Sequence, residues 1–135
     1  MKRTLIVFFV LFVAVLCLST ESRPSSWLGW DMILFGWPHF SESGQLIRVE
    51  GVSALLGYAS RNFFEPVQVN QINFFWEFGV HSLLLGVHGG LGLVYPIPFQ
   101  YETLYLIGSI TGIWGLTTMF LPIFPIPSFG IALVF

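Results

Sequence analysis

Three observations predict an all-β fold: a small membrane β-barrel or membrane β-sheet of about six to eight antiparallel strands. Residues 72–97 alternate apolar side chains with polar or small ones, with the period of two that a half-buried strand requires. The chain is 55% hydrophobic and 9% charged, whereas roughly 25% of an average soluble domain is charged. Residues 128–135 alternate again and end on Phe135.

The N-terminus has the pattern of a secretory signal peptide. Two basic residues precede an apolar run over 5–18, which is shorter than the ~20 residues of a membrane span, and small or polar residues follow from Ser19. We expect cleavage near residue 19, which leaves 20–135 as a single membrane-embedded β domain. A cut after Ser22 and an uncleaved anchor stay open as alternatives.

The first half of the mature chain contains two predicted strands. Residues 28–35 alternate moderately and predict the first, residues 41–45 (SESGQ) predict a turn, and residues 46–58 predict the second. The alternation of the second strand weakens near Gly51, which favours a β-bulge there.

The next segment is the most polar of the mature chain. Residues 59–71 predict a solvent-exposed loop, with a short strand at 67–69. A proline-broken loop is expected at 95–102, and the alternation returns over 103–114. Three prolines between 122 and 127 would be costly inside a central strand, so we expect a break there.

Residues 72–84 and 87–97 form the clearest strand pair. A turn at Leu85–Gly86 explains why the alternation changes phase, and it pairs Val80 with Leu91 and Trp76 with Tyr95. From Leu84 to Trp76 this strand rises about 26 Å, close to the ~25 Å apolar band of a membrane barrel. The side chains expected to face lipid are Phe74, Phe78, Val80, Leu91 and Leu93, and those expected to face inward are Asn73, Glu77, His81 and Gly92.

The end of the chain resembles the closing strand of bacterial outer-membrane β-barrel proteins. Those proteins typically finish on a C-terminal aromatic residue with apolar side chains at alternating positions before it, and Phe129, Ile131, Leu133 and Phe135 fit this pattern. Together with the signal peptide, the resemblance implies export, insertion by the barrel-assembly machinery and an outer-membrane location. Eight strands are the usual minimum for a single-chain barrel.

An α-helical membrane protein with two or three spans is the alternative fold. Residues 74–95 and 104–121 are each long enough to span as helices, and the mean hydropathy of +0.80 favours this reading. Gly108 and Gly112 would then form a GxxxG packing motif. Five glycines between 79 and 92 argue against a helix, because each costs ~1 kcal/mol relative to alanine in an exposed helix interior.

Glu77, His81 and His88 are the only titratable cluster in the apolar half of the chain. A carboxylate and imidazoles on one face can bind a metal ion or relay protons, so these three are weak candidates for such a site. The alternative is a hydrogen-bonded polar patch inside the barrel. Ser82 points to the face opposite His81, which argues against a nucleophile–base pair. We expect no metal, no cofactor and no catalysis.

Two further groups of side chains have predicted places. Arg48 and Glu50 share a strand face and predict an ion pair in the lumen. The tryptophans are expected to anchor the protein at the membrane interface; they are Trp27, Trp30, Trp37, Trp76 and Trp114.

The predicted function is a non-catalytic outer-membrane barrel with a structural or adhesive role, or a narrow pore. The alternative is a helical inner-membrane protein whose Glu77/His81 face contacts a partner or an ion, and a membrane enzyme acting on lipid ranks third. The expected partners are the lipid bilayer and the barrel-assembly machinery, and self-association stays open. No basic stripe indicates nucleic-acid binding.

Overall fold

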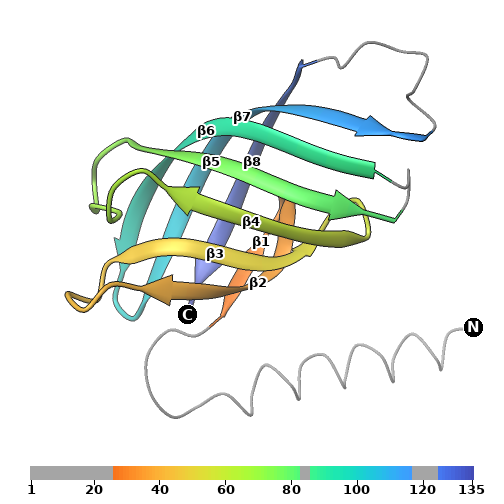
Figure 1. The fold of residues 1–135 in the computed structure, drawn as a ribbon. Helices are drawn as coiled ribbons and strands as arrows, with labels where there is room; N and C mark the ends of the chain where they lie inside the picture. Colours follow the sequence, from red (N-terminus) through yellow and green to blue (C-terminus); the bar gives the residue numbers. More distant parts are fainter. Residues whose placement is uncertain (1–25, 83–85, 117–124) are drawn as a thin grey trace, which may run out of the picture.

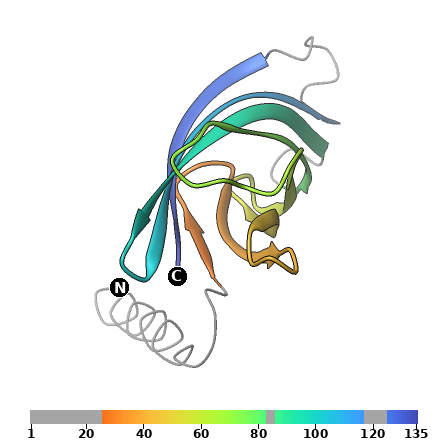
Figure 2. The same ribbon diagram turned by 90° about the vertical axis from the view of Figure 1, so that its left-hand side faces the viewer.

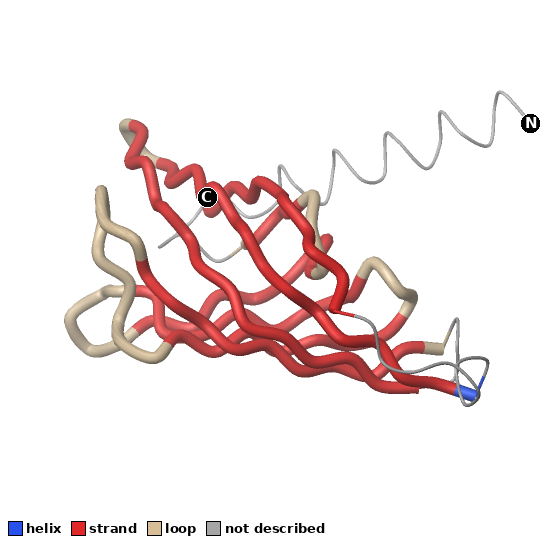
Figure 3. The backbone as a smooth tube through the Cα atoms, turned by 90° about the horizontal axis from the view of Figure 1, so that it is seen from above, coloured by secondary structure: helices blue, strands red, loops and turns tan. Residues whose placement is uncertain are grey.

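The computed structural model describes residues 26–82, 86–116 and 125–135, which form a closed antiparallel barrel (Figure 1). Each strand pairs with its neighbours in chain order, and the last strand pairs with the first. The strands are β1 (Trp27–Gly29), β2 (Ile33–Phe40), β3 (Leu46–Ser53), β4 (Gly57–Phe63), β5 (Asn73–His81), β6 (Gly86–Phe99), β7 (Glu102–Gly115) and β8 (Pro125–Val134). Figure 3 shows this wall of strands with loops at its two ends.

Short pairing between β8 and β1 closes the barrel. Trp27 pairs with Val134, and the register continues to Gly29 opposite Ala132. Ser26 and Phe135 extend the seam by exchanging two backbone hydrogen bonds of 3.2 Å each. The seam joins the two ends of the sheet, but β1 pairs with only three residues of the ten-residue β8, so closure is confined to the C-terminal part of β8.

The predicted all-β class is confirmed, and the helical alternative is wrong wherever the structure describes 74–95 and 104–121. Those segments are the strands β5, β6 and β7. Across the described ranges, no helix is long and apolar enough to cross a membrane. The predicted signal peptide at 1–19 lies outside the described residues.

The predicted strand over 28–35 is in fact two strands with a turn at 30–32. The carboxylate of Asp31 accepts a hydrogen bond of 3.2 Å from the backbone N–H of Ile33, which is the turn geometry that a short acidic side chain supports. Alternation alone does not reveal such a turn, because the side chains on both sides of it continue to alternate.

The predicted strand over 46–58 also divides, because β3 ends at Ser53. A turn at 54–56 follows, with Leu56 at a positive φ of 55°. Gly51 itself pairs regularly with Gly36 and Ala59. The irregularity expected near Gly51 lies next to it, where Val52 and Ser53 pair with Phe35 and Ile33 and the extra residue is on β2. A second register shift lies between His39 and Phe40.

The predicted loop over 59–71 is shorter than expected, because β4 extends to Phe63. The predicted strand at 67–69 is not a strand. Residues 64–72 form a loop that joins opposite sides of the barrel end: the N–H of Val67 donates to Leu46 of β3, and the N–H of Asn70 donates to Pro96 of β6. Figure 2 looks onto this end and shows the yellow-green loop in front of the barrel strands.

The hairpin of β5 and β6 has the predicted faces but another register. Val80 pairs with Val87 instead of Leu91, and Trp76 pairs with Leu91 instead of Tyr95. Gly86, expected in the turn, already belongs to β6 and pairs with His81. The displacement is four residues, so every side chain stays on its predicted face. Alternation specifies the face of a strand but not the position of the turn.

The predicted loop at 95–102 is also wrong, because β6 continues through Pro96 and Pro98 to Phe99. Pairing with β5 stops at Val94, so beyond this residue one side of β6 has no strand neighbour. The carbonyl of Pro96 faces that side, where it accepts the hydrogen bond from Asn70. Proline lacks an N–H donor and is tolerated at such an edge.

The inner face of the barrel is filled by side chains of mixed chemistry. Its fully buried residues include aromatic, aliphatic and charged groups, such as Trp27, Phe75, Val49, Val94 and Arg61. Val67 of the loop joins this core, so the loop contributes a side chain to the barrel interior. The outer face of β5 to β8 is apolar, and its exposed large side chains are Phe74, Trp76, Phe78, Val80, Val87, Leu91, Leu93, Phe99, Leu106, Ile110, Trp114, Ile126, Phe129 and Ile131.

Candidate functional site: a buried charge cluster in the barrel

A three-residue charge cluster lies inside the barrel around Arg61. The Nη2 atom of Arg61 is 2.5 Å from Oδ2 of Asp31 and 2.5 Å from Oε2 of Glu77, and its Nε donates to the same Glu77 oxygen at 3.0 Å. The three side chains are 0–2% exposed. Hydrogen bonds between ionised groups are stronger than neutral ones, so this network fixes the relative position of three segments.

The sheet register and the first turn bring these residues together. Arg61 of β4 and Glu77 of β5 are direct cross-strand partners on the inner face. Asp31 comes from the turn between β1 and β2, and Gly130 of β8 allows it to approach: a Cβ atom at Gly130 would lie 2.4 Å from the Cβ of Asp31.

Two aromatic rings complete the surroundings of the guanidinium. The Cζ atom of Arg61 lies 4.3 Å from the centroid of Phe75 and 5.6 Å from that of Trp27. Trp27 in turn packs against Tyr105 at 5.2 Å between ring centroids, and Phe75 packs against Phe63 at 6.0 Å. Ring faces attract a cation, and this attraction is stronger away from water.

His81 and His88 form a second polar group, nearer the other end of β5. Their rings stack with 5.9 Å between centroids and 20° between planes, and Nε2 of His81 lies 3.3 Å from the carbonyl oxygen of Val87. His88 lies over Gly79, where a Cβ atom would be 2.3 Å from its Cε1. The glycine on β5 therefore provides the space that the imidazole of β6 occupies.

The structure places Glu77, His81 and His88 on the same inner wall, but it does not assemble them into a metal site. His88 lies opposite Gly79, because the hairpin register differs from the predicted one by four residues. Glu77 is bound to Arg61. Across residues 26–82, 86–116 and 125–135, no group of three His, Cys, Asp or Glu side chains could hold a metal ion.

Several buried polar atoms of this wall have no hydrogen-bond partner among the described residues. They are Nη1 of Arg61, Oε1 of Glu77, Nδ1 of His81, both ring nitrogens of His88 and Oγ1 of Thr111. Buried polar groups in native proteins are nearly always hydrogen-bonded, often to internal water. These atoms are therefore the part of the interior with free capacity for water or another small polar molecule.

No family model, curated protein or solved structure matches this chain.

Sequence reasoning missed Asp31 and Arg61, which are central to the cluster. Arg61 was expected in an exposed loop, although Ala59, Arg61 and Phe63 alternate with polar residues as β4 requires. That alternation covers only a few residues and is followed by a long polar loop, so the sequence alone does not separate the strand from the loop. The buried position of Asp31 depends on the turn that divides β1 from β2.

The Arg48–Glu50 pair lies on the outer wall and not in the lumen. Val49 and Ser53 of β3 are fully buried, so the alternate positions face outward. There Nε of Arg48 is 3.4 Å from Glu50, whose other oxygen is 3.1 Å from Nε2 of His39. We call Arg48, Glu50, His39, Ser60 and Asn62 the outer polar patch; all five lie on β2 to β4.

The remaining predictions concern the tryptophans and Ser82. Four of the tryptophans are exposed on the outside, but Trp27 is buried inside the barrel and is not an interface anchor. Ser82 donates from its hydroxyl to the carbonyl of Leu56 in an exposed turn, away from the stacked histidines.

Proposed function

We propose that this chain is a non-catalytic outer-membrane β-barrel protein with a structural or adhesive role. The observation that carries the proposal is the distribution of polarity in β5 to β8. Their outer faces expose large apolar side chains, while the ion pairs of Arg61 lie inside. A soluble protein has the opposite arrangement, because it buries apolar surface and hydrates charge.

The extent and length of the apolar wall also support a bilayer as its partner. Monomeric soluble proteins rarely expose contiguous apolar patches above a few hundred Å², and this wall covers four adjacent strands. Tilted membrane strands need about 9–11 residues. The lengths of β5, β6, β7 and β8 are 9, 14, 14 and 10 residues.

The filled interior favours a structural or adhesive role over a narrow pore. Trp27, Arg61 and Phe75 are fully buried in the interior, and Val67 of the 64–72 loop belongs to the same hydrophobic cluster as Trp27 and Phe75. A conducting lumen needs hydrated space along its axis, and these side chains occupy it. We therefore expect no ion conductance across planar bilayers. Steady single-channel currents would instead support the narrow-pore function.

The closing seam supports the barrel-assembly machinery as a partner. The β1–β8 contact is short, so each backbone pair at the seam matters, and Phe135 supplies two of its hydrogen bonds. Each unpaired backbone group in lipid costs several kcal/mol. Deleting Phe135 should lower the membrane-inserted yield at matched synthesis. An unchanged yield would count against insertion through the last strand.

The decisive experiment is to fractionate a bacterial host that produces the full chain. We expect the protein in the outer-membrane fraction, with an intact mass lowered by ~2 kDa for a leader of this length. Its folded form should give a β-type circular dichroism spectrum and migrate differently in gels with and without boiling. A full-length mass would favour a signal anchor, and recovery in the soluble fraction would end the membrane proposal.

A further inference from the structure

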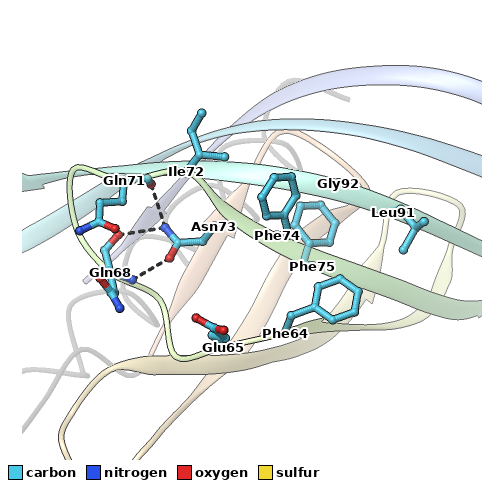
Figure 4. Close-up of a pocket in the computed structure, with 10 residues that line it drawn as sticks. All are labelled: Phe64, Glu65, Gln68, Gln71, Ile72, Asn73, Phe74, Phe75, Leu91 and Gly92. Carbon is cyan, nitrogen blue, oxygen red and sulfur yellow. Dashed lines mark hydrogen bonds between the residues drawn. The ribbon is translucent and has the colours of Figure 1, made fainter.

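A depression of about 560 Å³ lies at the rim of the barrel, where the 64–72 loop meets the beginning of β5 and the middle of β6. Figure 4 shows its lining: the carboxylate of Glu65 lies between Gln68 and the ring of Phe64 in this view, below the hydrogen bonds of Asn73. The depression adjoins the charge cluster at Phe75, which lines it and whose ring centroid lies 4.3 Å from Cζ of Arg61, but the charged side chains of the cluster are enclosed inside the barrel.

The two sides of the rim depression differ in chemistry. On one side, four apolar side chains are each about 60% exposed; they are Phe64, Ile72, Phe74 and Leu91. On the other side are Glu65, Gln68 and Gln71 of the loop. Phe74 and Leu91 belong to the apolar outer wall, so the depression joins that wall to a polar loop. Such a boundary fits an amphiphile with its chains on the wall and its headgroup at the loop.

The polar side is held in place by hydrogen bonds. The amide of Asn73 donates to the carbonyls of Gln68 and Gln71 at 2.9 and 2.8 Å, and it accepts from the N–H of Gln68 at 2.8 Å. Asn70, at a positive φ of 57°, donates to Pro96. The loop is thus tied to β5 and β6, and its polar groups need little reordering to bind a ligand.

The charge of the rim depression selects the headgroup. Glu65 is the ionisable residue among those that line it, and its side chain is exposed. We propose that the rim depression binds a phospholipid whose headgroup ends in a primary ammonium, as in phosphatidylethanolamine. The ammonium donates to the Glu65 carboxylate and to a glutamine side-chain oxygen, and the ring of Phe64 adds a cation–π contact.

The same chemistry disfavours other common headgroups. A trimethylated ammonium, as in phosphatidylcholine, has no N–H to donate. An anionic headgroup, as in phosphatidylglycerol, is repelled by Glu65. A free amine without acyl chains would leave the four apolar side chains uncovered. The inference rests on the proposed membrane function, because the acyl chains need the outer wall to lie in lipid.

The test uses the folded full chain in vesicles that contain equal fractions of phosphatidylcholine, phosphatidylethanolamine and phosphatidylglycerol. Native mass spectrometry then counts the lipids that remain bound after mild activation. We expect phosphatidylethanolamine to be retained about fivefold over the other two, the effect of one exposed charged contact. Equal retention of all three lipids in a correctly inserted protein would overturn the lipid site alone. Failure to insert into vesicles would instead overturn the proposed membrane function.

Two matched variants test whether Glu65 is responsible. Glu65→Gln should abolish the preference, and Glu65→Lys should shift it toward phosphatidylglycerol. Glu42, exposed in the turn at the same end of the barrel, is the control position. Glu42→Gln and Glu42→Lys should leave the preference for phosphatidylethanolamine unchanged. A preference that survives Glu65→Gln, or that Glu42→Lys also reverses, would overturn the assignment to the rim depression.

Discussion

The two halves of the barrel wall differ, although they enclose one interior. Strands β2, β3 and β4 have 8, 8 and 7 residues and carry the outer polar patch, whereas β5 to β8 have 9 to 14 residues and an apolar outer face. The patch lies toward the end of the barrel that holds the 41–45 turn and the 64–72 loop. From this difference we infer that the thickness of the proposed membrane region is set by β5 to β8, and that β2 to β4 lie at its edge.

The largest loss of stability is expected for the buried ion pairs that connect β4 of one half with β5 of the other. Arg61 of β4 binds Glu77 of β5, so Arg61→Met leaves Glu77 and Asp31 buried without their cation. Removing one partner of a buried pair costs about 3–5 kcal/mol. Urea unfolding of the variant in lipid vesicles should measure this loss of stability.

The control for this prediction is Arg48→Met on the neighbouring strand, whose ion pair is partly exposed. It should cost at most about 1 kcal/mol, as surface pairs do. Replacing all three members together, as Asp31→Asn, Arg61→Met and Glu77→Gln, should recover part of the loss. Equal losses of unfolding free energy for Arg61→Met and Arg48→Met would contradict the claim that the buried ion pairs of Arg61 hold the two halves of the barrel together.

The next effect compares the outer faces directly. Val80→Arg places a charge on the apolar wall of β5, next to the last residue of the strand. Its cost should lie between the ~0–1 kcal/mol of an interface and the ~2–4 kcal/mol of the membrane midplane. Ser60→Arg, on β4 directly opposite Glu50, places the same charge in the outer polar patch. There the Glu50 carboxylate can pair with it, so we expect a cost of about 0–1 kcal/mol. The readout is again the free energy of unfolding in vesicles, and equal costs at the two positions would remove the proposed boundary.

A smaller difference in stability is expected between substitutions on the inner and outer faces of the β5–β6 hairpin. Gly79→Ala brings a methyl group into His88 and the Tyr58 carbonyl, at 2.3 and 2.5 Å, and overpacking of this kind costs about 1–3 kcal/mol. Gly89→Ala on the outer face meets its nearest atom at 3.5 Å and should be tolerated. The melting temperatures of the two variants in detergent should differ accordingly. If Gly89→Ala were the more damaging, the assignment of faces would be reversed.

The faces of β5 and β6 were predictable from sequence because alternation directly reports which side of a strand is buried. Phe78 and Val80 are exposed and Glu77 and His81 are buried, as predicted. The register was not predictable, since a displacement of four residues leaves the alternation unchanged. The loop predicted at the prolines of β6 was wrong for a related reason. A proline is costly only where its missing N–H would pair with a neighbouring strand, and β5 ends before Pro96 and Pro98.

The charge cluster depends on information that alternation does not contain. Glu77 was identified as a candidate, but its partners were not. Arg61 meets Glu77 through the register of β4 and β5, whereas Asp31 reaches them only when the barrel closes and the β1–β2 turn brings it against Gly130. Likewise, the outer location of Arg48 and Glu50 follows from where β3 begins, and not from the identity of either residue.

The outer wall of β5 is proposed to lie in lipid while its alternate side chains face a closed interior. Single cysteines at positions 74 to 81, in a Cys17→Ser background, can be exposed in folded proteoliposomes to a lipid-soluble maleimide. We expect fast reaction at 74, 76, 78 and 80 and little reaction at 75, 77, 79 and 81, whose positions are buried. Uniform reaction, a period near 3.6 residues, or no reaction at any position would contradict the proposed arrangement.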